Sequence, residues 1–269
     1  MRLSQFPSPV RGFMRWLGLA LCRLGVDSVS YGDQRIRVLE GAEVLRFLAP
    51  RSKEERFLSN LNLEGRVIYD IGAYRGLLTC FFAMRTGPDG EVVAFEPGPR
   101  NFAALQRRIE INGLGNVMVF QVGVSESDGD AVLVAKKGRA ATGSIQREIQ
   151  ESYIRSEHFE SVDIRVATLD SCVVDCGLPP PDFIKIDTEG CEVGVLAGSK
   201  LTLERHRPDL FIEVHGASEE AKHANAHELL ETLRSRGYAI RHVESGLEVT
   251  EDDCSHAKEG HLYCRPNAR

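Results

Sequence analysis

The chain has 269 residues, of which 42% are hydrophobic and 27% charged, with 25 glycines and 11 prolines. These figures are typical of a globular chain with a sizeable core, and they exclude disorder, a collagen-like repeat and a disulfide-stabilised miniprotein. With 33 basic and 39 acidic residues, the formal net charge is −6. Nucleic-acid-binding domains are usually basic, so the charge disfavours a nucleic-acid partner.

The cysteine pattern bears on the cellular compartment. The seven cysteines are scattered without a Cys-x-x-Cys pair. Cys172 and Cys176 stand four residues apart, but no second Cys/His pair with zinc-finger spacing follows them. The pattern therefore indicates reduced thiols in a cytoplasmic protein rather than a structural zinc site.

The first predicted helix falls within residues 10–25, which are apolar with basic flanks. Its longest uncharged run, 16–22, is too short to span a bilayer and short for the apolar part of a signal peptide. We expect an amphipathic helix that packs on the body of the protein, with peripheral contact to a membrane or a partner as the alternative. A strand or hairpin over 31–39 and a helix over 54–61 complete a predicted N-terminal helical extension or cap, residues 1–62.

From residue 66 onward, short β-branched runs alternate with helical stretches. Strands are predicted over 66–70, 91–95, 117–122, 183–187, 209–214 and 238–243, and helices over 76–86, 100–112, 190–197 and 218–236. Between the third and fourth strands lie a short strand (131–134), a helix (145–157) and an extended segment (162–167), and 262–265 closes the chain. Such alternation predicts a doubly wound parallel sheet, in which ligands bind beyond the carboxyl ends of the strands.

The first of these strands ends in the glycine-rich turn DIGAYRG (70–76), which leads into a helix. Glycines permit a tight turn and let backbone N–H groups approach a ligand at a helix N-terminus. Asp70, at the last strand position, is placed either to accept hydrogen bonds from a ligand or to brace the loop. The dinucleotide fingerprint fails because position 74 is Tyr, and no Gly-Lys-Ser/Thr follows for a phosphate-binding loop. A nicotinamide-dependent oxidoreductase is therefore disfavoured.

The second strand ends at Glu96, about twenty residues beyond the glycine turn. An acid at this place and spacing is suited to binding the two hydroxyls of a ribose. Taken alone, Glu96 is equally suited to capping its own loop. In combination with the glycine turn, the pattern favours a nucleoside site.

Acidic residues and a histidine lie at the ends of the fourth and fifth strands of the regular pattern, 183–187 and 209–214. The segment KIDTEGCE (185–192) places three carboxylates within six residues, which is more than a helix cap needs. If the strands are neighbours, one pocket receives Asp187, Glu189, Glu213 and His215, because strand alternation turns side chains two residues apart to the same face. Such a cluster serves as a general base, as a hard-cation site or as a structural hydrogen-bond network, and the sequence leaves all three open.

Five segments together resemble the FkbM-type family of S-adenosylmethionine-dependent methyltransferases. They are DIGAYRGLLT (70–79), AFEPGPRNFAAL (94–105), TLD (168–170), FIKIDTEGCEVGVLAG (183–198) and PDLFIEVHG (208–216). The motif KIDxEGxE followed by IEVH, in this order, is far more specific for the family than the glycine turn. The resemblance implies an α/β, Rossmann-like class I methyltransferase fold over residues 63–269, with a seven-stranded, mostly parallel sheet and helices on both faces.

The resemblance also implies a functional site. S-adenosylmethionine is expected to contact Asp70, Gly72, Ala73, Tyr74, Gly76, Thr79, Glu96, Pro97, Ser125, Lys185 and Asp187, with its adenine near residues 123–126. Catalysis is expected from Asp187, His215, Glu189 and Glu213, and Asp187 and Glu213 are the alternative ligands of a Mg²⁺ ion. Because such enzymes commonly O-methylate sugars and other natural-product hydroxyls, we expect a small or glycosylated acceptor. The alternative is a catalytically silent cofactor-binding or partner-interaction protein of the same fold.

Overall fold

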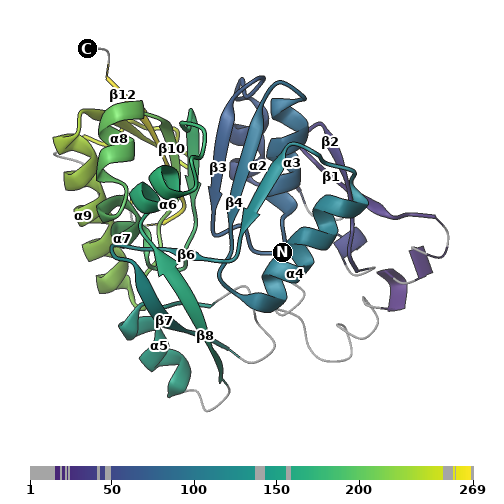
Figure 1. Ribbon diagram of the computed structural model, residues 1–269, viewed down its shortest axis with the longest axis horizontal. Helices are drawn as coiled ribbons and strands as arrows, with labels where there is room; N and C mark the ends of the chain where they lie inside the picture. Colours follow the sequence, from purple (N-terminus) through teal and green to yellow (C-terminus); the bar gives the residue numbers. More distant parts are fainter. Residues whose placement is uncertain are drawn as a thin grey trace.

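Figure 1 shows the computed structural model, whose described residues are 16–18, 20, 21, 23, 25–40, 43–45, 50–136, 143–155, 159–250, 257 and 259–267. Its centre is a seven-stranded sheet with the order β11-β12-β10-β9-β3-β4-β5. Neighbouring strands run parallel except β12, which is antiparallel to β10 and β11. The strands are β3 (Val67–Ile71), β4 (Glu91–Phe95), β5 (Val117–Phe120), β9 (Phe183–Ile186), β10 (Asp209–Glu213), β11 (Tyr238–His242) and β12 (His261–Pro266).

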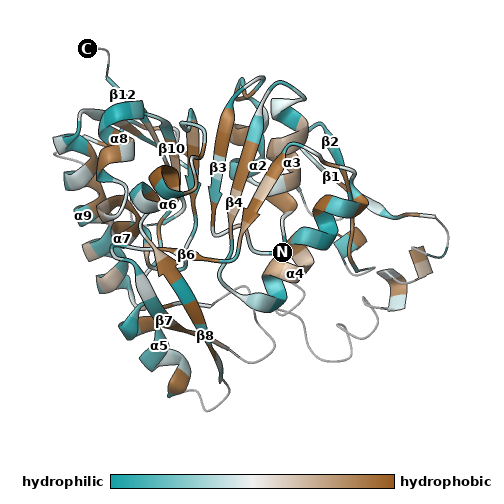
Figure 2. Cartoon of the chain, viewed as in Figure 1, coloured by the Kyte–Doolittle hydropathy of each residue, from teal (hydrophilic) through white to brown (hydrophobic). Residues whose placement is uncertain are grey.

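The central strands are apolar along their whole length because both faces of the sheet are covered. Successive residues of β3 alternate between two hydrophobic clusters: Tyr69 packs toward the helices after β5, and Ile68 packs toward the helix after β3. Figure 2 shows the same division, with hydrophobic central strands and hydrophilic outer helix surfaces. The sheet and its covering helices confirm the predicted α/β fold class.

Apart from the helix 147–154, which packs on a second sheet, the helices fall into two groups on the two sides of the main sheet (Figure 1). Their bounds are α2 (Lys53–Ser59), α3 (Leu77–Thr86), α4 (Pro99–Ile111), α5 (Arg147–Ile154), α6 (Leu169–Asp175), α7 (Glu192–Ala197), α8 (Lys200–His206) and α9 (Glu219–Ser235). The sequence did not predict α6 and α8, each of which has seven residues. The Thr168 side chain caps α6 by accepting from the Ser171 N–H, which explains how so short a helix is defined.

The N-terminal part of the chain packs into the same core as the sheet. The described residues of 16–23 are helical, and β1 (Ser28–Tyr31) and β2 (Gln34–Arg37) then form an antiparallel hairpin. Tyr31 and Ile36 of the hairpin share a buried cluster with Leu58 of α2 and Phe81 of α3. This hairpin lies slightly upstream of the predicted one, and the division into residues 1–62 and 63–269 stays a prediction.

A second, smaller sheet projects from the body at the bottom of Figure 1. It consists of β6 (Gly123–Val124), β8 (Phe159–Ala167) and β7 (Gly129–Lys136), in that order. Helix α5 covers one face, where Ile149 and Tyr153 pack against Val134. The opposite face, with Leu133 and Ile164, contributes to a pocket described below.

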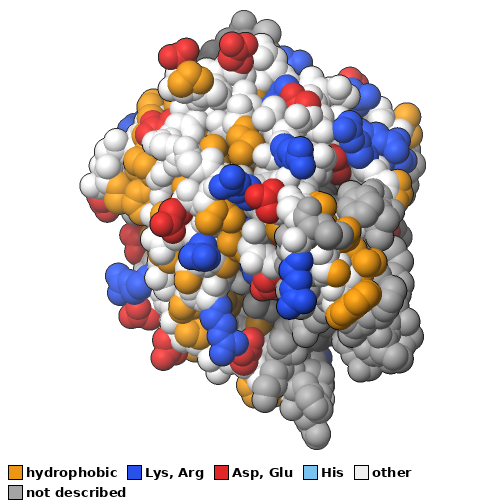
Figure 3. Space-filling view, turned by 90° about the vertical axis from the view of Figure 1, so that its right-hand side faces the viewer, with side chains coloured by type: hydrophobic (Ala, Val, Ile, Leu, Met, Phe, Trp, Pro, Cys, Tyr) orange, Lys and Arg blue, Asp and Glu red, His pale blue; other side chains and the backbone are white. Residues whose placement is uncertain are grey.

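The surface carries charges of both signs. On the face shown in Figure 3, Lys and Arg side chains are interspersed with Asp and Glu, with hydrophobic side chains between them. Among the described helices, none has the length and apolar character that crossing a membrane requires. The cysteines Cys80, Cys172, Cys176, Cys191 and Cys264 are free thiols.

Candidate active site

A pocket opens beyond the carboxyl ends of β3, β4 and β9, between the main sheet and the smaller one. The sheet is wound in opposite directions on the two sides of β3 and β9, and ligands of doubly wound sheets bind at such a point. The predicted cofactor residues that line the pocket are Gly72, Tyr74, Glu96, Pro97 and Asp187. Of the predicted catalytic residues, Glu189 and Asp187 line it as well.

The glycine turn after β3 is shaped by the loop that follows β9. Gly72 has a φ of +77°, and a Cβ at this position would collide with the backbone oxygen of Asp187. The N–H groups of Gly72 and Ala73 both donate to the Phe95 carbonyl at 3.0 Å. Tyr74 also has a positive φ, 52°, a conformation that costs a non-glycine residue about 1 kcal/mol. The turn therefore follows a backbone path that few sequences adopt, close against β4 and β9.

Glu96 fixes this turn through its carboxylate. Its Oε2 accepts from the Tyr74 N–H at 2.9 Å, and its Oε1 accepts from the Gly98 N–H at 2.8 Å and from Asn101 Nδ2 at 3.2 Å. Burial raises the pKa of Glu96 to about 7, although these hydrogen bonds act in the opposite direction. A carboxylate has about four acceptor positions, and three donors contact Glu96, so this lining residue retains capacity for a ribose hydroxyl.

Asp70, Thr79 and Lys185 lie beneath the turn. Asp70 is fully buried, accepts from Thr79 Oγ1 at 2.6 Å and lies 3.2 Å from Lys185 Nζ. Lys185 also donates to the Gly72 carbonyl at 2.8 Å. Burial acts to lower the pKa of Lys185, but the carboxylates of Asp187 and Asp70 raise it above its ordinary value. These contacts brace the loop from below.

Three other predicted cofactor residues lie around the pocket. Ala73 is buried against Leu105 of α4, and Gly76, with a φ of +81°, begins α3 against the same leucine. Ser125 lies against Gly194 of α7 and against Gly198, the C-cap of that helix. Among the residues that the structure describes, Ala73, Gly76 and Ser125 do not line the pocket and instead lie behind the residues that do.

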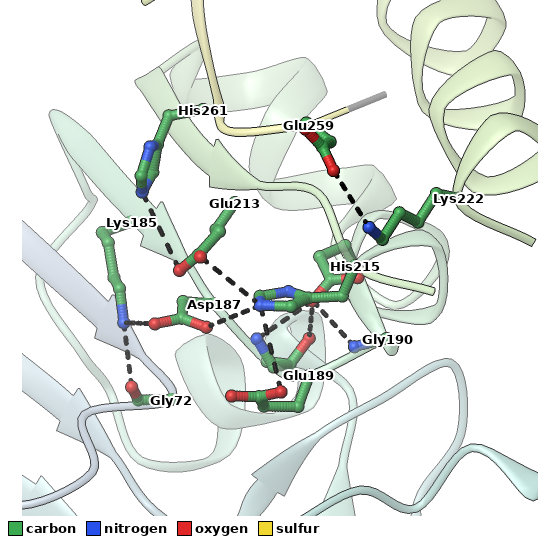
Figure 4. Close-up of polar contacts among 12 residues, drawn as sticks. Gly72, Lys185, Asp187, Glu189, Gly190, Glu213, His215, Lys222, Glu259 and His261 are labelled. Carbon is green, nitrogen blue, oxygen red and sulfur yellow. Dashed lines mark hydrogen bonds and ion pairs between the residues drawn. The ribbon is translucent and has the colours of Figure 1, made fainter. Parts of the chain in front are cut away.

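His215 is the centre of a polar cluster that comes from the loops after β9 and β10 (Figure 4). Its Nδ1 lies 3.1 Å from Glu192 Oε1. Three further carboxylates surround Nε2, at 3.6 Å (Glu213), 3.8 Å (Asp187) and 4.0 Å (Glu189). Burial acts to lower the pKa of His215, but these carboxylates raise it to about 10. The imidazole is therefore protonated at neutral pH in the ligand-free protein.

Glu192 has a defined position in this cluster that the sequence did not assign. Only 1% of its side chain is exposed, and its Oε1 accepts from the Thr188 N–H, the Thr188 hydroxyl and the Gly190 N–H as well as facing His215. The available signal was its place in the segment KIDTEGCE at the first position of α7. Glu192 thus fixes the ring of His215 so that Nε2 points at the other carboxylates.

His261 joins the cluster from β12, a position that no sequence pattern had indicated. The antiparallel register places His261 opposite Glu213, with its Nε2 3.8 Å from Glu213 Oε2. Its Nδ1 lies 2.7 Å from Glu244, and its ring stacks on Phe211. Only the strand order of the folded sheet brings these residues together, so no local motif could reveal them.

Three of these side chains are spaced to hold a cation. One ligand atom each from Asp187, Glu213 and His215 lies within 4.8 Å of the others. Burial acts to raise the pKa of Asp187, but Lys185 lowers it, whereas burial and Asp187 raise the pKa of Glu213. A divalent cation bound here would have to displace the proton of His215, because a metal ligand must be unprotonated.

The fold is that of a class I methyltransferase. Four features define it: the strand order of the sheet, the antiparallel β12, the glycine turn after β3 and the acid after β4. A comparison with known families agrees: the methyltransferase FkbM domain matches residues 70–240. The chain belongs to this family.

Curated relatives include methyltransferases and a longer synthetase. The chain is 27% identical to the AMB antimetabolite synthetase AmbE of Pseudomonas aeruginosa over 65% of its own length, but over only 10% of that protein. It is 27% identical to the hexuronic acid methyltransferase AglP of Haloferax volcanii, covering 67% of this chain and 65% of the relative. It is 30% identical to the 2-O-methyltransferase NoeI of Sinorhizobium fredii, covering 65% of this chain and 74% of the relative.

A solved structure supports the fold. The methyltransferase FkbM from Methylobacillus flagellatus superposes with a TM-score of 0.51 at 20% identity, covering 82% of this chain and 50% of that one. At this identity the likeness concerns the fold alone.

Proposed function

We propose that the chain is an S-adenosylmethionine-dependent O-methyltransferase that acts on a hydroxyl of a sugar or another small acceptor. The observation that carries the proposal is the position of Asp187, which lines the pocket beside the glycine turn and also belongs to the cluster around His215. Asp187 therefore connects the nucleoside-type pocket with the neighbouring cluster of acid/base groups. The names of AglP and NoeI support a sugar-like acceptor and transfer to oxygen.

The residues of the pocket fit the cofactor. The Gly72 backbone lies directly against the Asp187 carbonyl, where a side chain would clash, and Glu96 keeps one acceptor position for a ribose hydroxyl. Pro97 offers an apolar surface next to Glu96 for the adenine. The cofactor supplies a methyl group that its sulfonium already activates, so the chain has to align an acceptor and accept its proton.

The acid/His cluster is assigned to the acceptor hydroxyl. His215 is protonated at neutral pH, so it can act as a base only after losing a proton. Proton uptake is therefore assigned to the carboxylates of Asp187 and Glu213, of which Glu213 has the raised pKa and so binds a proton more readily. His215 balances their charge, and Glu189 contacts the acceptor at the pocket wall. Mg²⁺ held by Asp187 and Glu213 remains the alternative way to polarise the hydroxyl.

Calorimetry with S-adenosylmethionine tests the cofactor part of the proposal. We expect micromolar binding by the wild type and a loss of about a hundredfold in affinity for Glu96→Ala, since a charge-assisted hydrogen bond to a buried group contributes about 2–3 kcal/mol. Absence of binding, or binding unchanged by the substitution, contradicts the proposal.

A screen of sugar and other hydroxyl acceptors with methyl-labelled cofactor tests transfer. We expect label in at least one hydroxyl compound, and binding of the cofactor without transfer to any acceptor favours the catalytically silent alternative. A variant lacking residues 1–25 further separates the enzyme from the partner-interaction protein. If this variant still transfers the methyl group, the result favours the enzyme. If it loses only its contact with a partner or a membrane, that contact is assigned to residues 1–25.

A further inference from the structure

Arg75 links the cofactor turn to the N-terminal part of the chain. It belongs to the turn DIGAYRG, directly after Tyr74, but its side chain points away from the pocket lining. Its Nη2 lies 2.7 Å from Glu40 Oε1, and its Nη1 lies 3.5 Å from Glu43 Oε1. Burial acts to lower the pKa of Arg75, but the two carboxylates raise it. The turn is thus held from outside by residues that precede it by more than thirty positions.

Glu43 connects three parts of the chain. Besides Arg75, its carboxylate lies 2.7 Å from Nη2 of Arg108 in α4, and it accepts from the Leu39 N–H at 3.2 Å. Arg108 is 97% removed from solvent at its side chain, so the pair with Glu43 is largely buried. Because α4 also carries Asn101, which donates to Glu96, Glu43 joins both elements that position the Glu96 carboxylate.

The segment around Glu43 is itself anchored. Val44 and Leu45, the next two residues, are buried, and the Glu43 N–H donates to the Glu40 carbonyl at 2.9 Å. Surface ion pairs between mobile side chains contribute little to stability. A charged side chain on an anchored segment instead restrains the group that it faces. Arg75 therefore meets carboxylates whose backbone is fixed by packing.

We propose that Glu43 and Arg75 are positioning residues for the cofactor: residues 39, 40 and 43–45 clamp the turn 72–76 in the conformation that binds it. The proposal rests on the proposed function and gives the N-terminal segment a role in it. Neither residue contacts the reacting atoms. Their pairing holds the positive φ of Tyr74 and the hydrogen bond from its N–H to Glu96.

Arg75→Gln is the variant of choice because it leaves the buried Glu43–Arg108 pair intact. Asp33→Asn is the matched control: it breaks an ion pair of the same kind, 3.0 Å long, between the β1–β2 hairpin and Arg85 at the other end of α3. Two quantities are measured on the full chain. One is the amide hydrogen-exchange protection of residues 72–77 without ligand, and the other is the Kd for S-adenosylmethionine by calorimetry.

We expect Arg75→Gln to lower protection of the Tyr74 and Gly76 amides about tenfold and to raise the Kd five- to tenfold, with Asp33→Asn changing neither. Glu43→Gln also removes the partner of buried Arg108, so we expect it to lower protection and affinity at least as much as Arg75→Gln and to lower stability as well. In the double variant the lost Glu43–Arg75 pair is shared, so its effect should be smaller than the sum of the two single effects. Unchanged protection in Arg75→Gln overturns the clamp. If the wild type binds no cofactor, the proposed function fails while the exchange data still decide whether the clamp exists.

An unchanged Kd with reduced protection overturns the role in cofactor binding and leaves the proposed function standing. Equal effects of Arg75→Gln and Asp33→Asn on the Kd also overturn it, because they would show a general loss of stability. Recovery of protection and affinity in Arg75→Lys, which keeps the charge, supports the pairing as the cause.

Discussion

The two ends of the candidate site are built in different ways. At β3 and β4 the pocket is bounded by the glycine turn and by Glu96, which is held by N–H groups within a few residues of the two strand ends. At β9, β10 and β12 a cluster of charged side chains surrounds His215, and Asp187 and Glu189 of this cluster also line the pocket (Figure 4). Geometry therefore defines the first end, and electrostatics defines the second.

This difference matters for function. The glycine turn has little freedom to change, because a Cβ at Gly72 would collide with the Asp187 backbone. A charged cluster instead sets proton affinities, as the pKa of about 10 for His215 shows. Damage to the first end should abolish cofactor binding, and damage to the second should slow transfer while the cofactor still binds.

Gly72→Ala tests the backbone-built end and should have the largest effect. The new Cβ meets the Asp187 backbone oxygen at a φ of +77°, so strain and overpacking together should destabilise the protein by about 3 kcal/mol. Binding of S-adenosylmethionine should fall more than about a hundredfold, since the turn has to move. Denaturant unfolding and calorimetry measure the two effects.

Gly65→Ala is the control for Gly72→Ala. Gly65 also has a positive φ, +69°, but nothing lies within 4 Å of the added Cβ. We expect Gly65→Ala to lower the free energy of unfolding only by the backbone strain, about 1 kcal/mol, and to leave the Kd for S-adenosylmethionine unchanged. If the two variants behave alike, the close contact between the loops after β3 and β9 does not shape the site.

The sequence was more informative about the first end of the pocket than about the second. The glycine turn and Glu96 lie in local motifs, so their spacing along the chain already indicated a nucleoside site. His261 reaches Glu213 only because β12 inserts antiparallel beside β10, a pairing between residues 48 positions apart. Helices α6 and α8 were missed, although α2 and α7, which are no longer than these, were predicted.

His215→Asn tests the charged end. Asn keeps a donor for Glu192 but removes the imidazolium, so we expect turnover to fall about a hundredfold, with the Kd for the cofactor within a few fold. His227→Asn, which changes an exposed histidine of α9, should retain full activity. Wild-type turnover by His215→Asn would assign the cluster to structure alone, and a parallel loss of cofactor binding would remove the distinction between the two ends.

The pH dependence of cofactor binding sharpens the comparison. Glu96, with a pKa of about 7, is ionised above that pH and gains a proton as the pH falls through it. A protonated carboxyl accepts a ribose hydroxyl more weakly, so the Kd should rise toward low pH by at most about tenfold per unit below pH 7. Calorimetry from pH 5.5 to 8.5 measures this, and Glu96→Gln should remove this dependence. A Kd that falls at low pH would contradict the assignment.

Addition or chelation of Mg²⁺ should have the smallest effect, less than about twofold on the rate of transfer. Protonated His215 already supplies a positive charge among Asp187, Glu189 and Glu213, and buried Lys185 supplies another, so a divalent cation would have to displace a proton with a pKa of about 10. In His215→Asn that competing charge is gone, and millimolar Mg²⁺ should then raise the unfolding temperature more than it does in the wild type. A large loss of wild-type activity with a chelator would show instead that the charged end holds a metal ion during transfer, with Asp187 and Glu213 as its carboxylate ligands.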